Sequence, residues 1–303
     1  MLSDYETSYP YIPQPSILRR LFLTCKITKD SVVNATIDIL KRAETQLPSD
    51  VINALEQAQM REASQIAKAQ LSAILQNIEI AKERSIPMCQ DTGILVFFVE
   101  LGRNVHLDFN LEDAIIEGVR RATESIPLRP NAVDPLTRKN SGNNTGIGLP
   151  DIKYELVDGD KITITVAPKG AGSENMSAIT MLNPTEVDSI RNFILTTVLN
   201  AGGMPCPPIV VGVGIGGSFD KAARLAKSAL LRDIDPENMT ELERGILNDI
   251  NSLGIGPMGL GGDTTALAVH IKTAHCHTAS LPVAVNIQCW ANRHASVTLG
   301  GDE

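Results

Sequence analysis

The chain has 303 residues, of which 43% are hydrophobic and 20% charged, and its 27 basic and 35 acidic side chains give a formal net charge of −8. This composition excludes disorder and collagen-like repetition, and the acidic balance argues against general affinity for nucleic acid or an anionic membrane. Because no run reaches the roughly 18 apolar residues of a membrane span, we expect neither nucleic-acid nor membrane partners. The length allows one large domain or two small ones.

Five cysteines are spread over the whole chain: Cys25, Cys89, Cys206, Cys276 and Cys289. An odd, scattered set does not suit the disulfide framework of a small secreted module, so we expect reduced thiols. No CxxC pair occurs, and any metal site must therefore combine distant segments. The N-terminus shows no signal-peptide pattern, which predicts a cytoplasmic protein.

Helical spacing predicts a helical layer over residues 31–85, after an N-terminal extension over residues 1–30. Apolar residues Val33, Ile37 and Leu40 recur at helical intervals. A break at residues 48–50 separates this helix from two others, which we predict over 51–60 and 64–84.

Strands become frequent after residue 86. The chain-order prediction is a strand over 93–101, a helix over 111–125, a hairpin of 152–157 with 161–166, a helix over 184–200, a strand over 209–213, helices over 220–231 and 241–253, and strands over 265–272 and 281–288. The hairpin prediction rests on the turn pair Asp158-Gly159, and the helix over 184–200 on Pro184 at its start. We therefore expect a mixed α/β (α+β) fold, in which an N-terminal helical layer precedes mixed sheets with helices.

A glycine motif lies between a predicted strand and a predicted helix. Gly212, Gly214 and Gly217 satisfy the GxGxxG pattern of dinucleotide-binding proteins in the required context. However, the next segment predicts a turn and another helix instead of a second strand ending in an acidic residue. We favour a tight turn whose glycines permit close packing or present amides to an anion, and we keep nucleotide binding as an alternative.

Three cysteines lie beside residues that restrict the backbone or are polar. Cys89 occurs in PMCQDTG, Cys206 in GMPCPP and Cys289 in VNIQCW. A buried cysteine is often only a small apolar residue, and we interpret Cys25 and Cys276 in that way. Three thiolates can instead hold an iron-sulfur cluster with one iron open to substrate as a Lewis acid. The wide spacing of the three matches no local metal motif.

These motifs resemble the iron-sulfur hydro-lyases that comprise class I fumarate hydratases and L-tartrate dehydratases. The resemblance spans most of the chain and is densest in MCQDTG, KGAGSENMS, GVGIGGSFDKAARLAK, GLGGDTTALAVHI and HTASLPVAVNIQCW. It implies that Cys89, Cys206 and Cys289 ligate a [4Fe-4S] cluster with one open iron. It also implies one catalytic domain over 1–303, with residues 86–300 as the cluster-binding part.

The resemblance further implies roles for residues near the cysteines. Those implied to bind a small dicarboxylate are Gln90, Arg129, Gly170 and Gly172, while Asp91 and His277 would relay protons. The chemistry suits these types, since a guanidinium binds a carboxylate in a fork and Asp and His exchange protons. Alternatives stay open: Arg129 could cap a surface turn, Lys169 could be a solvated charge, and His277 could be a core histidine. His275 would share a face with His277 in an extended segment.

The family has a second unit that completes the site, and this sequence ends soon after its last cysteine. The resemblance therefore implies an α subunit that pairs with a separate β subunit, in an (αβ)₂ heterotetramer. We favour reversible hydration of fumarate to L-malate. Dehydration of L(+)-tartrate to oxaloacetate is the nearest alternative, and a non-catalytic zinc or electron-transfer protein is a remote one.

Overall fold

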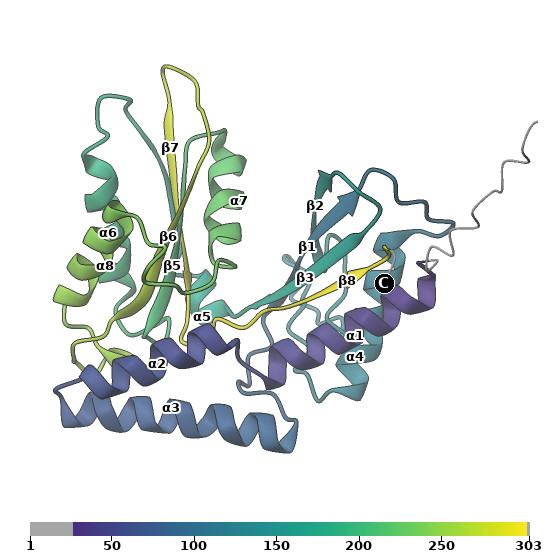
Figure 1. Cartoon of the computed structure of the whole chain (residues 1–303), viewed down its shortest axis with the longest axis horizontal. Coiled ribbons are helices and arrows are strands. Elements are labelled where there is room, and N and C mark those ends of the chain that lie inside the picture. Colours follow the sequence, from purple (N-terminus) through teal and green to yellow (C-terminus); the bar gives the residue numbers. More distant parts are fainter. Residues whose placement is uncertain (1–26, 302–303) are drawn as a thin grey trace, which may run out of the picture.

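The computed structural model describes residues 27–301 and arranges them in two four-stranded sheets with helices packed on them. The sheets form two lobes that lie side by side (Figure 1). The second and third N-terminal helices run beneath the lobe whose sheet is formed by strands within residues 178–288. The expected mixed α/β (α+β) fold is confirmed. Within the described range, no helix is long and apolar enough to cross a membrane. Cys25, with most of the predicted N-terminal extension, lies outside the described residues.

The three predicted N-terminal helices are confirmed, with ends that differ by a few residues. They are α1 (Lys29–Thr45), α2 (Ser49–Arg61) and α3 (Gln65–Arg84). The hydroxyls of Thr28 and Ser64 accept backbone hydrogen bonds at the starts of α1 and α3, which satisfies amides that lack an intrahelical acceptor. Leu55 and Leu71 join α2 and α3 through one apolar cluster.

The first sheet has the strand order β2-β1-β3-β8. Its strands are β1 (Ile94–Gly102), β2 (Asp151–Val157), β3 (Ile162–Lys169) and β8 (Ala295–Leu299). Helix α1 and helix α4 (Leu111–Ser125) pack on it, and Phe97, Ile115 and Ile164 are fully buried between these layers. The predicted helix over 111–125 is thus confirmed.

The predicted hairpin of β2 with β3 is wrong, because β1 lies between the two strands. β1 pairs parallel with β2 and antiparallel with β3. The turn residues bond to the end of β1 instead: the amide of Gly102 donates to the carbonyl of Lys161, and that of Asn104 donates to that of Gly159, both at 2.9 Å. The turn was recognised correctly, but the strands that it joins are two sheet positions apart.

The second sheet has the strand order β4-β7-β5-β6. Its strands are β4 (Ala178–Leu182), β5 (Ile209–Ile215), β6 (Ala266–Thr273) and β7 (Leu281–Gln288). Helices α6 (Ser189–Ala201) and α8 (Glu241–Ser252) lie on one face, and α7 (Phe219–Ala229) lies on the other (Figure 1). The predicted helix over 184–200 begins five residues late, because Pro184 belongs to a turn in which the Glu186 amide donates to the Asn183 carbonyl.

The glycine motif allows α7 to lie directly against β5. A Cβ atom on Gly212 would stand 2.1 Å from the carbonyl oxygen of Ala226, and one on Gly214 would stand 2.0 Å from that of Ala222. No larger side chain fits at either position without moving the helix. The close-packing interpretation of this motif is therefore confirmed.

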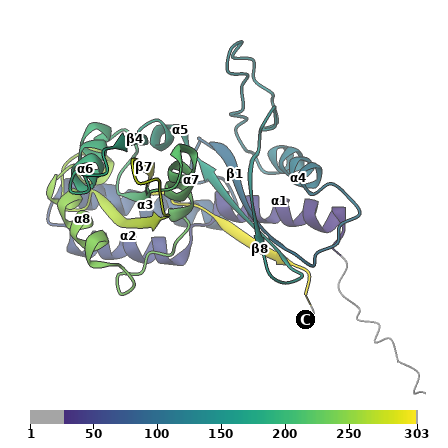
Figure 2. The same ribbon diagram turned by 90° about the horizontal axis from the view of Figure 1, so that it is seen from above.

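Several short elements were not predicted from the sequence. They are α5 (Ala171–Glu174), β4, β8 and a 3₁₀ turn at Pro257–Gly259. Between α4 and β2, the chain forms a long projecting connection, on the same side of the molecule as α5 (Figure 2). We call its residues 130–149 the arm. Within the described residues, its strand pairings are two isolated bridges, Val133 with Asn140 and Gly146 with Leu149.

A buried histidine on β6 makes stability depend on pH. His270 is 1% exposed, its Nδ1 lies 3.1 Å from the carbonyl oxygen of Ala229, and burial lowers its pKa to about 4. Between pH 6.5 and 4, the unfolded chain gains a proton on this histidine and the folded chain does not. The contribution of His270 to the free energy of unfolding is therefore fully present above pH 6.5 and is lost as the pH falls toward 4. We expect the wild type to lose up to roughly 3 kcal/mol more than His270→Asn between pH 7 and 4. Urea unfolding of both proteins at each pH measures this difference, and parallel curves would contradict it.

Candidate active site

Three cysteines from distant parts of the chain meet where both sheets approach α2 and α3. Cys89 follows α3, Cys206 precedes β5 and Cys289 follows β7. All three are half-buried free thiols that pack against the apolar cluster of α2 and α3. The amide of Trp290 donates to the carbonyl of Cys206 at 3.2 Å, which joins two of the three segments. The structure thus brings together the thiols that the sequence motifs singled out.

Local backbone geometry fixes two of these cysteines. Cys206 has φ of +55°, a left-handed conformation that costs a non-glycine residue about 1–3 kcal/mol and persists only where its surroundings hold it. The amide of Met258 donates to the carbonyl of the adjacent Pro207 at 2.8 Å. The Cys89 sulfur accepts a hydrogen bond from the amide of Asp91 at 3.5 Å.

The electrostatic environment of the thiols fits an iron-sulfur group. Burial raises the pKa of Cys206 and of Cys289, and the nearby Cys89 raises both further. The buried cations Arg293 and Lys169 act in the opposite direction on Cys289, toward the thiolate that metal binding requires. Residues 27–301 contain no group of three or more His, Cys, Asp or Glu side chains placed to hold one metal ion. In a cluster, each thiolate binds a different iron, so three separated soft thiols suit a cluster better than a single zinc ion.

Asp91 ties three segments together at this site. Its Oδ1 accepts hydrogen bonds from the amide of Gly93 at 2.9 Å and from Nδ2 of Asn131 at 2.8 Å, and its Oδ2 accepts one from the amide of Ala171 at 2.8 Å. The carboxylate therefore joins the Cys89 loop to the base of the arm and to the start of α5. Oδ2 accepts one hydrogen bond from the described residues and keeps capacity to accept another.

The glycine loop before α5 fills the space between two cysteine segments. A Cβ atom on Gly170 would stand 3.1 Å from Oδ2 of Asp91, and one on Gly172 would stand 3.2 Å from the carbonyl oxygen of Met204. Both glycines thus allow close approach to the segments of Cys89 and Cys206. The amide of Gly172 lies in the first turn of α5 and has no intrahelical acceptor.

Lys169 anchors this loop to β7, the strand that precedes Cys289. Its ammonium donates to the carbonyl of Ile287 at 2.6 Å and to the hydroxyl of Ser173 at 2.9 Å, and it lies 3.3 Å from a carboxylate oxygen of Glu174. Lys169 is 5% exposed, and burial lowers its pKa to about 8. The alternative that Lys169 is a solvated charge is therefore wrong.

Arg129 and Gln90 present polar groups to solvent beside the thiols. The amide of Arg129 donates to the hydroxyl of Thr92 at 2.9 Å, which fixes its backbone next to Asp91. Its side chain is exposed, and the guanidinium forms no ion pair or hydrogen bond within the described part of the chain. Gln90 is also exposed, with its Oε1 4.0 Å from the Cys89 sulfur. Both side chains are available to a ligand.

His277 is not near the cysteines of its own chain. It lies in the turn between β6 and β7, whereas Cys206 and Cys289 lie at the other end of the same sheet (Figure 1). The seven residues of β5 separate these ends by roughly 20 Å. His277 is exposed, so the core-histidine alternative is wrong, and the neighbouring His275 and Cys276 are exposed too.

Sequence reasoning missed a buried ion pair behind the site. A guanidinium nitrogen of Arg293 lies 2.7 Å from a carboxylate oxygen of Glu44, and both side chains are at most 2% exposed. Arg293 also donates to the carbonyl of Asp91 and interacts with the Cys89 and Cys289 thiols. Burial raises the pKa of Glu44 to about 7 despite the attraction of Arg293. Arg293 stands four residues after Cys289, and that proximity was its only signal in the sequence.

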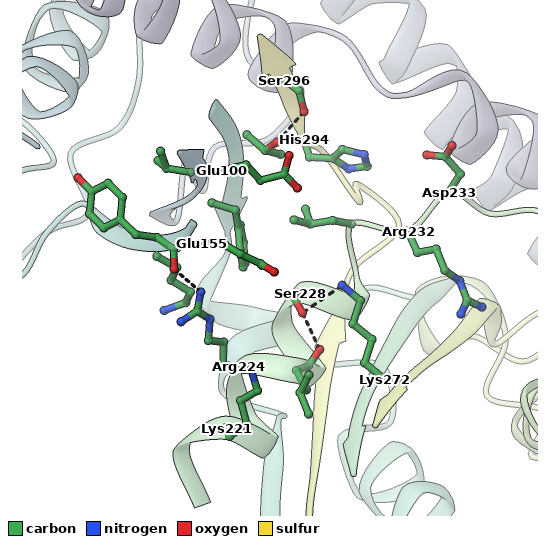
Figure 3. A pocket seen from close by; sticks show the side chains of 17 residues that line it. Glu100, Glu155, Lys221, Arg224, Ser228, Arg232, Asp233, Lys272, His294 and Ser296 are labelled. Atoms are coloured by element: carbon green, nitrogen blue, oxygen red, sulfur yellow. Dashed lines mark hydrogen bonds between the residues drawn. The ribbon is translucent and has the colours of Figure 1, made fainter. Parts of the chain in front are cut away.

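A cleft of about 750 Å³ lies apart from these residues, between α7 with β6 and the open face of the first sheet. Figure 3 shows its charged walls, with Glu100 and Glu155 on the sheet and Lys272 and Arg224 opposite. Arg224 spans the cleft by donating to the carbonyl of Tyr154 at 2.8 Å. None of the predicted site residues lines it.

Comparison with known proteins gives consistent results over most of the chain. The family model described as "Fumarate hydratase (Fumerase)" matches residues 33–298. A Methanocaldococcus jannaschii protein named "Putative L(+)-tartrate dehydratase subunit alpha" is 50% identical over 273 residues, which cover 87% of this chain and 96% of that protein. Proteins of Escherichia coli strains UTI89 and K12, both named "L(+)-tartrate dehydratase subunit alpha", are 34% and 33% identical over 284 residues, which cover 90% of this chain and 94% of each relative.

Proposed function

The chain belongs to the family of class I fumarate hydratases and L-tartrate dehydratase α subunits and is a hydro-lyase, and from this premise we propose that it is the cluster-binding α subunit of an enzyme that reversibly hydrates fumarate to L-malate. The observation that carries the proposal is the convergence of three free thiols near the exposed guanidinium of Arg129, which has no ion-pair or hydrogen-bond partner among residues 27–301. A small dicarboxylate needs a cation at one end and an electrophile at the other, and this arrangement can supply both.

In this proposal, Cys89, Cys206 and Cys289 hold a [4Fe-4S] cluster. Such a cluster, when bound, supplies an open iron that acts as a Lewis acid toward a carboxylate and a hydroxyl. The buried Arg293 and Lys169 stabilise the Cys289 thiolate electrostatically. The apolar residues of α2 and α3 keep water from the back of the site.

The chain's own residues bind and orient the substrate. Arg129 holds the distal carboxylate with its forked guanidinium, and Gln90 donates from its amide beside Cys89. Gly170 and Gly172 bring the α5 loop close enough for the Gly172 amide to donate to the substrate. Asp91 is oriented by three hydrogen bonds and exchanges a proton at Oδ2.

A second subunit completes the site in this proposal. The names of the relatives as alpha subunits support a β subunit, and we propose an (αβ)₂ heterotetramer. His277 lies at the far end of the sheet from the cysteines of its own chain. In this proposal, its side chain therefore transfers protons in the active site of another chain of the assembly. The four described cysteines are free, and we propose a reducing compartment, the cytoplasm.

L(+)-tartrate is the second candidate substrate, and the names of the relatives favour it. The two reactions differ at the substrate by one hydroxyl group. Pocket contacts discriminate such a difference only modestly unless a buried polar group is built for it. A parallel assay therefore decides between the two substrates.

The test uses the α chain with its β subunit, purified without oxygen and loaded with iron and sulfide. Loss of fumarate is followed by its ultraviolet absorbance, beside an oxaloacetate assay on L(+)-tartrate. Turnover of fumarate supports the proposal, and turnover of tartrate alone replaces the substrate. A fully loaded protein that converts neither acid would contradict the hydro-lyase mechanism proposed for this site.

Arg129→Ala tests the carboxylate clamp. We expect KM for fumarate to rise about 30- to 100-fold, which corresponds to the loss of roughly 2–3 kcal/mol from a charge-assisted hydrogen bond, while iron content stays at the wild-type value. Steady-state kinetics and iron analysis measure both. Arg121→Ala, on the surface of α4, is the matched control and should change neither. An unchanged KM in Arg129→Ala would refute the assigned clamp.

A further inference from the structure

The arm, residues 130–149, exposes two large aliphatic side chains that nothing in the described chain covers. Leu136 is 91% exposed and Ile147 is fully exposed. Single exposed apolar residues are common, but these two lie on one segment whose base is attached to the candidate site. Figure 2 shows that this segment stands away from the body of the molecule.

The arm is held in one conformation by its own hydrogen bonds. Asp134 Oδ1 accepts from the amides of Leu136 at 3.0 Å and Thr137 at 2.7 Å. Nδ2 of Asn140 donates to the carbonyl of Pro130 at 2.9 Å. Because these bonds fix the arm before it meets a partner, little conformational entropy is lost on binding.

The base of the arm is attached to the candidate site. Asn131 donates to Asp91, and the amide of Arg129 donates to Thr92. A second exposed apolar group borders the site near Cys206: Met204 is 68% exposed and Leu260 is 54% exposed. The close approach of Gly203 to Gly259 brings the segments of these two residues together. Met204 and Leu260 thus border the segment of Cys206, and the base of the arm is attached to the loop of Cys89.

We propose that the arm, together with Met204 and Leu260, is the surface on which the second subunit docks. This inference rests on the proposed function, which requires a β subunit at the opening of the site. Apolar contacts that surround a polar centre exclude water from it, as the site requires. Lys139 is exposed on the arm and forms no ion pair within residues 27–301, whereas Arg138 interacts electrostatically with Asp134. A partner surface with an acidic group opposite Lys139 and an apolar pocket for Leu136 and Ile147 would complement the arm.

The experiment measures the affinity of the purified α chain for its β subunit. For the double variant Leu136→Asp with Ile147→Asp, we expect a Kd at least about 30-fold weaker than that of the wild type, the effect of removing a central apolar anchor. Val187→Asp is the matched control, because Val187 is 58% exposed in the turn before α6, away from the proposed surface. It should bind as the wild type does, and all three proteins should have equal melting temperatures.

Hydrogen exchange in the wild-type complex gives a second readout that needs no variant. Amides of residues 130–149 should exchange more slowly with the β subunit bound. Unchanged Kd in the double variant, unchanged exchange in the arm, or self-association of the α chain through the arm would each overturn the proposal. A tight wild-type complex that converts neither fumarate nor tartrate would leave the docking surface intact and refute the proposed function instead.

Discussion

Cys89→Ser is expected to abolish iron binding and hydro-lyase activity together. A serine hydroxyl is a poor ligand for iron in a cluster, and Cys89 is the thiol that interacts with both Cys206 and Cys289. We expect turnover below about 1% of the wild type, a loss that corresponds to at least roughly 2.7 kcal/mol of transition-state stabilisation. Iron and sulfide analysis, with the visible absorbance of the reconstituted α chain alone, measures the cluster independently of activity.

Cys276→Ser is the matched control for this experiment. Cys276 is an exposed free thiol in the β6–β7 turn, at the end of the sheet far from the other three. It should keep wild-type iron content. If Cys276→Ser loses iron, or if Cys89→Ser keeps it, the proposed ligand set is incorrect.

Arg293→Ala is expected to lower the free energy of unfolding by about 3–5 kcal/mol at pH 8. The substitution leaves the Glu44 carboxylate, which is 0% exposed, without its partner, and an uncompensated buried charge is costly. Burial already raises the pKa of Glu44 to about 7. A raised carboxyl pKa contributes stability that is present below pH 4.5 and is lost as the pH rises through 7. The loss caused by Arg293→Ala should therefore be smaller at pH 5.5 than at pH 8.

Two further variants show whether the loss in Arg293→Ala comes from the buried charge. Urea unfolding at pH 5.5 and pH 8 measures the free energy of unfolding of every variant. Arg120→Ala removes one of the two basic partners of Glu117 on the surface of α4 and should cost less than about 1 kcal/mol. The double variant Arg293→Met with Glu44→Gln removes both charges and should recover much of the loss. Equal losses at pH 5.5 and pH 8 would contradict the assignment of the effect to the Glu44 charge.

The sequence predicted local structure well and long-range pairing poorly. Helix α4 and strand β7 were predicted with the observed bounds, because their apolar spacing and capping residues are local signals. The β2–β3 pairing failed, since no local signal reports that β1 inserts between two strands joined by a tight turn. β8 was missed because its alternating burial depends on β3, about 130 residues earlier.

The candidate site was predicted in part. Motif context singled out the three thiols, the family resemblance added Asp91 and the glycine loop, and the structure places these residues together. The buried partners Arg293 and Glu44 were not found, since charged residues in a sequence are usually solvated and their burial depends on the tertiary fold. The distance of His277 from the thiols follows from the direction of β7, which a motif does not encode.

The late position of β7 and β8 in the chain has a consequence for biosynthesis. β7 pairs with β4 and β5, β8 pairs with β3, and Cys289 lies between β7 and β8. Neither sheet is complete until residues 281–299 have left the ribosome, and contacts of such sequence separation form slowly. Nascent chains therefore expose Cys89 and Cys206 before Cys289 has been synthesised. If the chain holds the proposed cluster, assembly of that cluster must follow release of residues 281–299, and a chaperone or a strictly reducing environment would protect the early thiols until then.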